Sequence, residues 1–210
     1  MSTHTQDHAV NALNVAILVF DGVEVLDFAG PFEVFSVAAA LMPRTPYMPF
    51  FAYTVGLTAN CVRTTGGLTV TPHHSMHDCP QPDILIVPGG EGSRRLLKQD
   101  RLLAWIAEQA QHVQILASVC TGALVLARAG VLAGKRATTH HGAFDRLPEL
   151  EPSVVVVRDK RFLQDGKVWT SGGISAGIDM SLAIVDHLLG DNAPVVEEME
   201  WMWHQRLRSD

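Results

Sequence analysis

Short, mainly apolar runs of residues constrain the fold of this chain more than any other feature. They are Val15 to Phe20, Ile84 to Val87 and Val113 to Ser118, and a turn signal or a helical pattern follows each. Such runs predict strands that are buried on both faces, as in a parallel sheet. Helical patterns are expected at about 31–41, 94–98, 102–111, 121–129 and 176–189, with a last helix from about 193. This alternation predicts an α/β fold with a parallel, doubly wound central sheet and helices on both faces.

Weaker patterns predict the remaining strands. A strand is expected at 51–57, and short strands at 137–139, 154–158 and 168–170. Between Cys61 and Thr71, two alternating segments rich in threonine and valine flank Gly66-Gly67. A glycine pair between such segments predicts a short hairpin, which we expect at an edge of the sheet.

Composition excludes several classes of protein. The 210 residues carry 16 basic and 22 acidic side chains, a net charge of -6, and no basic run, so nucleic-acid binding is not expected. No apolar run is long enough to span a membrane. We expect a disordered tail over residues 1–13, which lacks the pattern of a signal peptide, and one domain over 14–210. Three cysteines without metal-like or paired spacing indicate a reducing compartment, so we expect a cytoplasmic protein.

Cys120 stands at the junction between a predicted strand and a predicted helix. The segment ILASVCTG runs from Ile115 to Gly122, and this arrangement is typical of a nucleophile elbow. The start of the helix is expected to lower the pKa of the thiol, and the backbone N–H of Thr121 is expected to face a developing oxyanion. The alternative is a small buried cysteine without a chemical role. Gly89 and Gly90 end a neighbouring strand, which favours the functional interpretation.

The carboxyl ends of the predicted strands are the expected place for a functional crevice. Four loops lie there, at 21–30, 88–92, 119–121 and 139–142. A dense group of polar residues at His73, His74, His77, Asp78 and Cys79 contains residue types that bind metals. Because prolines bracket this segment and it lies away from the elbow, we expect a solvated loop and no metal.

Four longer motifs carry a resemblance to a known family. They are VAILVFDGVEVLDFAGPFEVF, DILIVPGG, ASVCTGALVLARAGVLAGKRATTHH and TSGGISAGIDMSLAIV, and they are spread along most of the chain, from residue 15 to residue 185. The chain resembles the ThiJ/PfpI superfamily, whose fold is flavodoxin-like and of the class I glutamine amidotransferase type. LDFAGP, SVCTGA and GGISAGID resemble the branch that contains isonitrile hydratase and the N-terminal domains of AraC-type transcription regulators.

The resemblance implies roles for individual residues. Cys120 corresponds to the nucleophile, Asp27 to the acid/base group after the first strand, and Thr121 to the residue that follows the nucleophile. Gly90 corresponds to a glycine that contributes a backbone N–H. His140 corresponds to a residue that lines the substrate pocket.

His141 and Glu24 lie next to these residues in the sequence or on the same predicted loop, and their roles are open. The family branch usually has tryptophan after the pocket histidine, whereas this chain has His141, which implies a more polar pocket. Glu24 is a rival carboxylate on the same predicted loop as Asp27, and a solvated loop charge is the other interpretation of it.

The resemblance implies a cysteine-dependent enzyme that acts on a small molecule without a cofactor or a metal. The expected reaction is the hydration of an isonitrile to an N-substituted formamide. The alternatives are a non-catalytic sensor of a small molecule or an oxidant, and an amidase- or deglycase-type hydrolase. No helix-turn-helix pattern is present, so a complete transcription regulator is not expected. Relatives are commonly dimers, which implies a homodimer.

Overall fold

The computed structural model describes residues 12–41, 50–190 and 197–198. A seven-stranded sheet occupies its centre, with the strand order β10-β11-β7-β6-β1-β2-β5. All neighbours pair in parallel except β10 and β11, which form an antiparallel hairpin. The strands are β1 (Leu13–Leu18), β2 (Phe50–Gly56), β5 (His74–Ser75), β6 (Ile84–Val87), β7 (Ile115–Val119), β10 (Phe162–Asp165) and β11 (Val168–Ser171). Without the two edge strands this is the flavodoxin-like order, so the predicted fold class is confirmed.

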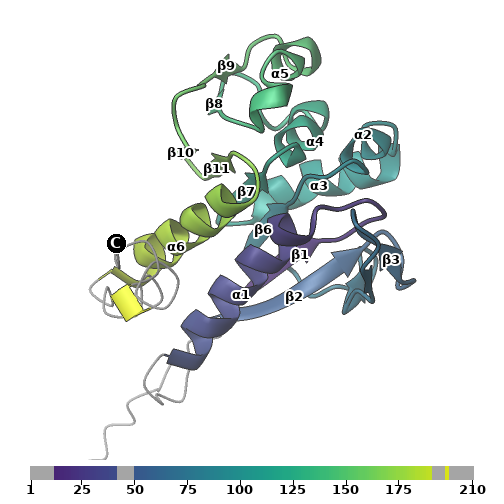
Figure 1. Cartoon of the computed structure of the whole chain (residues 1–210), viewed down its shortest axis with the longest axis vertical. Helices are drawn as coiled ribbons and strands as arrows, with labels where there is room; N and C mark the ends of the chain where they lie inside the picture. Colours follow the sequence, from purple (N-terminus) through teal and green to yellow (C-terminus); the bar gives the residue numbers. More distant parts are fainter. Residues whose placement is uncertain (1–11, 42–49, 191–196, 199–210) are drawn as a thin grey trace, which may run out of the picture.

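Helices cover both faces of this sheet. α1 (Val25–Leu41) and α6 (Ser175–Leu189) pack side by side in front of it in the view of Figure 1. The helices behind it include α3 (Asp100–His112) and α4 (Gly122–Arg128), which contact each other, and α2 (Ser93–Leu96) packs on α4. A parallel sheet requires such helices, because each crossover between parallel strands returns over one of its faces.

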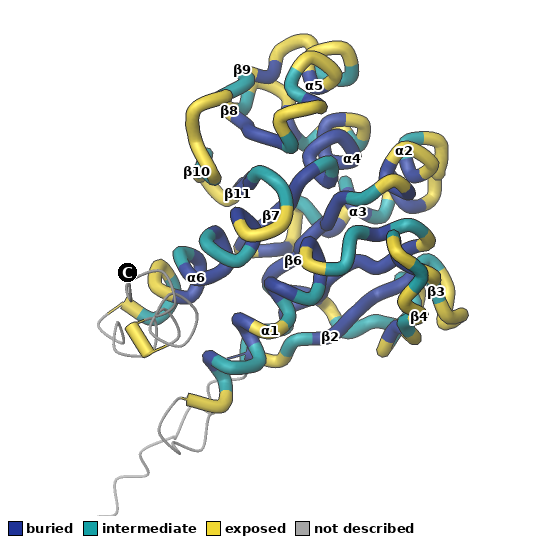
Figure 2. The backbone as a smooth tube through the Cα atoms, in the orientation of Figure 1, coloured by how far each residue is buried: buried dark blue, intermediate teal, exposed yellow. Residues whose placement is uncertain are grey.

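The three central strands form the middle of the core. Every residue of β6 and β7 is buried, and so is β1 from Val15 onward, as the dark blue segments in Figure 2 show. Because both faces of these strands are covered, each position must be apolar or small. This is why the corresponding runs in the sequence are continuous rather than alternating.

The structure corrects the predicted course of the chain after β1. Helix α1 begins at Val25 and not at Pro31, which lies inside it. A proline inside a helix removes one backbone hydrogen bond, a cost that tertiary packing can offset. Here the backbone at Gly30 packs so closely on α6 that an added Cβ would lie 2.8 Å from the side chain of Ile178. Asp27 therefore lies in the first turn of a helix and not on a loop.

Other elements differ from the prediction at the periphery. The 61–71 hairpin, β3 (Val62–Arg63) with β4 (Thr69–Val70), forms a separate sheet instead of lying on an edge of the main one. The short strands β8 (Arg136–Ala137) and β9 (Val155–Val156) also pair apart from the main sheet. Strand β10, helix α5 (Arg146–Leu150) and the 3₁₀ turn His141–Ala143 were not predicted, because such short polar segments carry little periodicity.

The two predicted ends of the chain are only partly described. Strand β1 begins at Leu13, one residue inside the predicted tail, and residues 1–11 lie outside the described residues. The helix expected from about residue 193 also lies outside them, apart from 197–198, so a single domain over 14–210 stays a prediction. No helix within the described ranges is long and apolar enough to cross a membrane.

Candidate active site

Cys120 occupies a strained turn between β7 and α4, as the sequence predicts. Its φ angle of 56° lies in the left-handed region, which a residue with a side chain adopts only when its surroundings hold it there. Its backbone N–H donates to the carbonyl oxygens of Ser171 and Gly172, both at 3.1 Å. Its own carbonyl accepts a bond of 2.8 Å from the hydroxyl of Thr139. These bonds from distant segments hold the turn in its strained conformation.

Asp27 meets Cys120 from the first turn of α1. The residue is completely buried. Its carboxylate accepts hydrogen bonds from the backbone N–H of Ile174, at 2.9 Å, and of Gly89, at 3.2 Å. It also forms a hydrogen bond with the thiol of Cys120. The acidic group proposed from the sequence is therefore next to the sulfur, although the predicted loop is a helix.

Burial dominates the electrostatics of this pair. It raises the pKa of Asp27, and the charge of Glu24 raises it further, whereas the bonds from Ile174, Cys120 and Gly89 oppose the rise. Burial, and then the charge of Asp27, raise the pKa of Cys120 to about 12. Hydrogen bonds from the backbone N–H and the hydroxyl of Thr121 act in the opposite direction and lower this pKa. The expected lowering of the thiol pKa is therefore wrong. Helix α4 has only seven residues, and it does not outweigh the burial of the thiol beside a carboxylate. When Asp27 is ionised, the proton that the two groups share lies on sulfur.

This raised pKa predicts a pH-dependent loss of stability. The native protein keeps the Cys120 proton up to about pH 12, whereas the unfolded chain releases it near the ordinary pKa of 9.0. The unfolded state therefore binds fewer protons between these values, and the free energy of unfolding falls as the pH rises. The free energy of unfolding, measured by chemical denaturation, should fall less over this pH range in Cys120→Ala than in the wild type. If it falls equally with pH in the two proteins, the pKa of Cys120 is not raised.

Thr121 and Gly90 lie together at the same turn. The N–H of Gly90 donates to the Thr121 hydroxyl at 3.1 Å, so this predicted donor is already occupied by a protein group. The hydroxyl of Ser93 lies 3.0 Å from the same threonine oxygen and 2.8 Å from the Gly90 carbonyl oxygen. Gly90 has a φ of 125°, and an added Cβ would lie 2.3 Å from the carbonyl oxygen of Gly22. Only glycine fits there, and Gly90 positions Thr121 rather than presenting a free N–H.

His140 lies close to the Cys120 sulfur. Its Nδ1 accepts a bond of 3.1 Å from the N–H of Gly142, so the neutral ring carries its proton on Nε2. Burial, and then the charge of His141, lower its pKa. A Cβ added at Gly173 would lie 3.1 Å from the Cys120 sulfur and 3.2 Å from the His140 ring. The sulfur and the ring therefore both pack against Gly173, whose missing side chain leaves room for them.

Sequence reasoning missed three residues that complete the site. The Ser93 hydroxyl bonds the Gly90 carbonyl and the Thr121 hydroxyl, and the Thr139 hydroxyl bonds the Cys120 carbonyl. The backbone N–H of Ile174 holds Asp27. Ile174 has a φ of 59°, which is rare for a β-branched residue, and its side chain is 49% exposed. The glycine pair Gly172-Gly173 directly before Ile174 indicates a turn. The backbone propensity of isoleucine, however, does not predict a left-handed conformation at this residue.

The strain at Ile174 predicts an unusual response to glycine. Relief of the left-handed conformation is worth roughly 1–3 kcal/mol, and added chain entropy costs roughly 0.5–1 kcal/mol. We therefore expect Ile174→Gly to raise the melting temperature. Val155→Gly is the matched control, since this valine is 55% exposed in an ordinary strand and should lose about 1 kcal/mol. Equal destabilisation by the two changes would show that Ile174 is not strained.

The histidine-rich segment 73–79 is more ordered than predicted. His74–Ser75 forms the edge strand β5, so the expectation of a loop is wrong for these two residues. His73 lies against β2, where its Nδ1 is 2.8 Å from the hydroxyl of Thr54. Within the part of the chain that the structure describes, no group of three or more histidine, cysteine, aspartate or glutamate side chains is arranged to hold a metal ion.

The fold and this site define a class: a flavodoxin-like α/β protein with a cysteine at a strand-to-helix elbow and a buried carboxylate beside it. The chain belongs to the DJ-1/PfpI family, whose family model matches residues 13–187. It is 38% identical over 187 residues to isonitrile hydratase of Pseudomonas putida, which covers 89% of this chain and 77% of that protein.

Regulators and solved structures are also similar. The HTH-type transcriptional regulator GbdR of Pseudomonas aeruginosa (strain UCBPP-PA14) is 30% identical over 180 residues, 86% of this chain. The chain spans about half of that regulator, 47% of its length. The crystal structure of a ThiJ/PfpI family protein from Pseudomonas syringae superposes with a TM-score of 0.76 at 27% identity, over 90% of this chain and 75% of that one.

Proposed function

We propose that this protein is a cysteine-dependent enzyme that hydrates isonitriles to N-substituted formamides. The observation that carries the proposal is the hydrogen-bonded pair of the Cys120 thiol and the completely buried Asp27 carboxylate. This pair supplies a nucleophile and, directly beside it, a group that accepts and returns its proton. The identity of 38% to an isonitrile hydratase supports the choice of substrate class.

The first half of the reaction forms a covalent intermediate. Asp27 takes the thiol proton as the sulfur of Cys120 attacks the terminal carbon of the isonitrile. The carboxylic acid then delivers that proton to the same carbon, which gives a thioimidate, R–N=CH–S–Cys. The N–H of Thr121 stabilises negative charge on the sulfur during the transfer, which is the direction in which it already acts on the thiol pKa.

The second half consumes one water molecule. Asp27 accepts a proton from water as the oxygen attacks the thioimidate carbon and delivers that proton to the nitrogen, which gives the tetrahedral adduct R–NH–CH(OH)–S–Cys. Collapse of this adduct breaks the C–S bond and releases R–NH–CHO, while Asp27 carries the hydroxyl proton to the sulfur. His140 lines the pocket as a neutral donor through Nε2–H, and its lowered pKa keeps it neutral. Isonitrile and water are the only species consumed, and no cofactor or metal takes part.

A small isonitrile panel tests the proposal. The purified protein is incubated with cyclohexyl isonitrile and with an aromatic isonitrile, and the formamide is detected by mass spectrometry. Formamide that appears with turnover, and takes up ¹⁸O from labelled water, is the expected result. Amides and glyoxals in parallel reactions report on the hydrolase alternatives. Turnover of one of these without isonitrile hydration would replace the proposed reaction.

Sensing is the second candidate function, and the identity of 30% to a transcription regulator favours it. A cysteine that senses an oxidant needs a low pKa, so the raised pKa of Cys120 weighs against an oxidant and favours a small molecule as the signal. The isonitrile panel separates the two functions. A sensor should turn over no member of the panel, whereas the proposed enzyme turns over.

The cysteines and the family resemblance support a proposed cellular compartment and oligomeric state. Cys61, Cys79 and Cys120 are all free thiols, which fits the reducing cytoplasm. We propose a homodimer that acts on a small molecule, with no nucleic acid or membrane as a partner. The mass measured by light scattering tests the dimer.

A further inference from the structure

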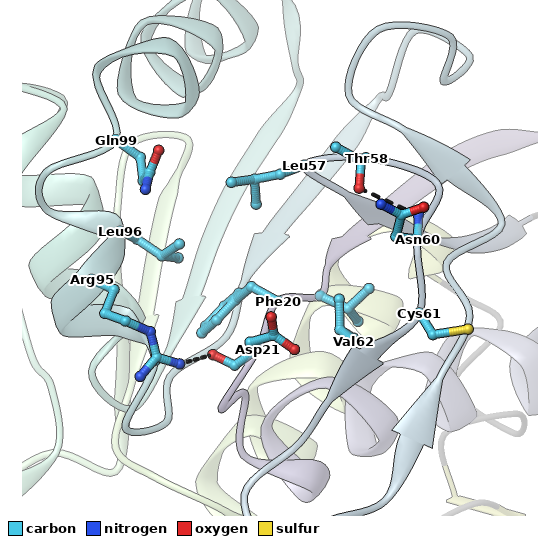
Figure 3. A pocket seen from close by; sticks show the side chains of 12 residues that line it. Phe20, Asp21, Leu57, Thr58, Asn60, Cys61, Val62, Arg95, Leu96 and Gln99 are labelled. Atoms are coloured by element: carbon cyan, nitrogen blue, oxygen red, sulfur yellow. Dashed lines mark hydrogen bonds between the residues drawn. The ribbon is translucent and has the colours of Figure 1, made fainter.

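A cavity of about 380 Å³ lies at the carboxyl ends of β1 and β2. Figure 3 shows it from close by. Three segments line it: Val19, Phe20 and Asp21; Leu57, Thr58, Asn60, Cys61 and Val62; and Gly92, Arg95, Leu96 and Gln99. Cys120, Asp27 and His140 do not line it. Its volume is at the lower end of the range of small-molecule sites, roughly 300–1,000 Å³. It is therefore large enough for one small metabolite and separate from the candidate active site.

One wall of this cavity is apolar. Phe20 and Leu96 are only 3% and 4% exposed and form part of the core, and Leu57 is half-buried beside them. Figure 3 shows these side chains converging on the centre of the cavity from three different segments. Because their other sides pack into the core, this wall is preformed and offers a surface for a hydrocarbon group.

One cation and one anion also border the cavity, and they do not pair with each other. The guanidinium of Arg95 donates through Nη2 to the backbone carbonyl of Asp21 at 2.6 Å. The Asp21 carboxylate accepts from the backbone N–H of Arg63 at 2.8 Å. Among the described residues, neither charged group forms an ion pair with a side chain. A guanidinium has five donors and a carboxylate about four acceptor positions, so both keep capacity for a ligand.

We propose that this cavity binds a zwitterionic α-amino acid with an apolar side chain. Its carboxylate would lie against Arg95, its ammonium group against Asp21, and its side chain against Phe20 and Leu57. A simple carboxylate would bring a second anion to Asp21, and a simple amine a second cation to Arg95. Only a ligand with both charges complements both groups. The proposal is independent of isonitrile hydration, because it uses no residue of the Cys120 site.

Calorimetric titration tests this proposal on Cys120→Ala protein, which removes the reactive thiol from the measurement. The probes are L-phenylalanine, 3-phenylpropanoate, which lacks the ammonium group, and phenethylamine, which lacks the carboxylate. L-Phenylalanine should bind with a Kd of about 1 mM or tighter, and each analogue at least about tenfold more weakly. Arg95→Gln and Asp21→Asn should each weaken L-phenylalanine by about tenfold, the scale of a charged hydrogen bond.

Arg94→Gln is the matched control. Arg94 is the exposed neighbour of Arg95 on α2 and does not line the cavity, so its loss should leave the affinity unchanged. Gln99→Trp keeps both charges but fills the cavity, and it should abolish binding in a folded protein even where Arg95→Gln proves unstable. Absence of L-phenylalanine binding, equal binding of 3-phenylpropanoate, or equal loss in Arg94→Gln would overturn the proposal. All of these outcomes are measured as binding, so they do not depend on whether the protein hydrates isonitriles.

Discussion

Replacement of Cys120 by alanine should reduce isonitrile hydration by about 10³-fold or more, the scale on which covalent catalysts lose rate without their nucleophile. The reason is that both C–S bond formation and C–S bond cleavage require the sulfur. The measurement is formamide production under conditions in which the wild type turns over. Alanine leaves no bulky group in the turn between β7 and α4, so near-UV circular dichroism should stay unchanged.

Cys61→Ala is the control for this result. Cys61 is an exposed free thiol outside the candidate active site, and its loss should leave the rate unchanged. If Cys120→Ala keeps a substantial rate, the hydration does not proceed through a thioimidate. If both variants lose rate equally, the effect comes from general thiol chemistry and not from the elbow.

Asp27→Asn should slow hydration by about a hundredfold or more, the usual loss when a general acid–base group is removed. Asparagine has the same shape but cannot carry the proton between sulfur, carbon and water. The pKa of Cys120 should also fall, because the charge of Asp27 is the second largest cause of its rise. The rate follows from formamide production, and the pKa from the pH dependence of alkylation.

The stability of Asp27→Asn separates a chemical role from a structural one. Asp27 is fully buried and both its oxygens accept a backbone N–H, so one N–H would face the amide group of asparagine and lose its partner. Such a loss costs about 1–3 kcal/mol, partly offset because a buried charge is removed. A normal rate and a normal thiol pKa in a less stable protein would make Asp27 structural only.

Much of the fold was predictable because its signals are local. The runs Val15 to Phe20, Ile84 to Val87 and Val113 to Ser118 became the three central strands, since burial on both faces excludes polar residues along most of their length. The turn at Cys120 was predictable for the same reason, as a strand pattern and a helix pattern meet at that residue. Gly90 and His140 were placed by resemblance and do lie beside it.

The start of α1 was mispredicted because a proline is a strong local signal for a first helical turn. Packing of α1 on α6 at Gly30 overrode that signal and extended the helix back to Val25. The left-handed Ile174 was missed for a related reason. Local propensity disfavours a β-branched residue there, and only the surrounding contacts hold it.

The sequence by itself determined the three central strands, most of the helices that follow them, and the place of Cys120 at the end of a central strand. Only the tertiary structure decided the chemistry around that cysteine. The bond that holds Asp27 comes from Ile174, 147 residues later in the chain, and the sign of the Cys120 pKa shift comes from burial by several elements together. Patterning depends on neighbours along the chain, whereas desolvation and the field of a carboxylate depend on neighbours in space.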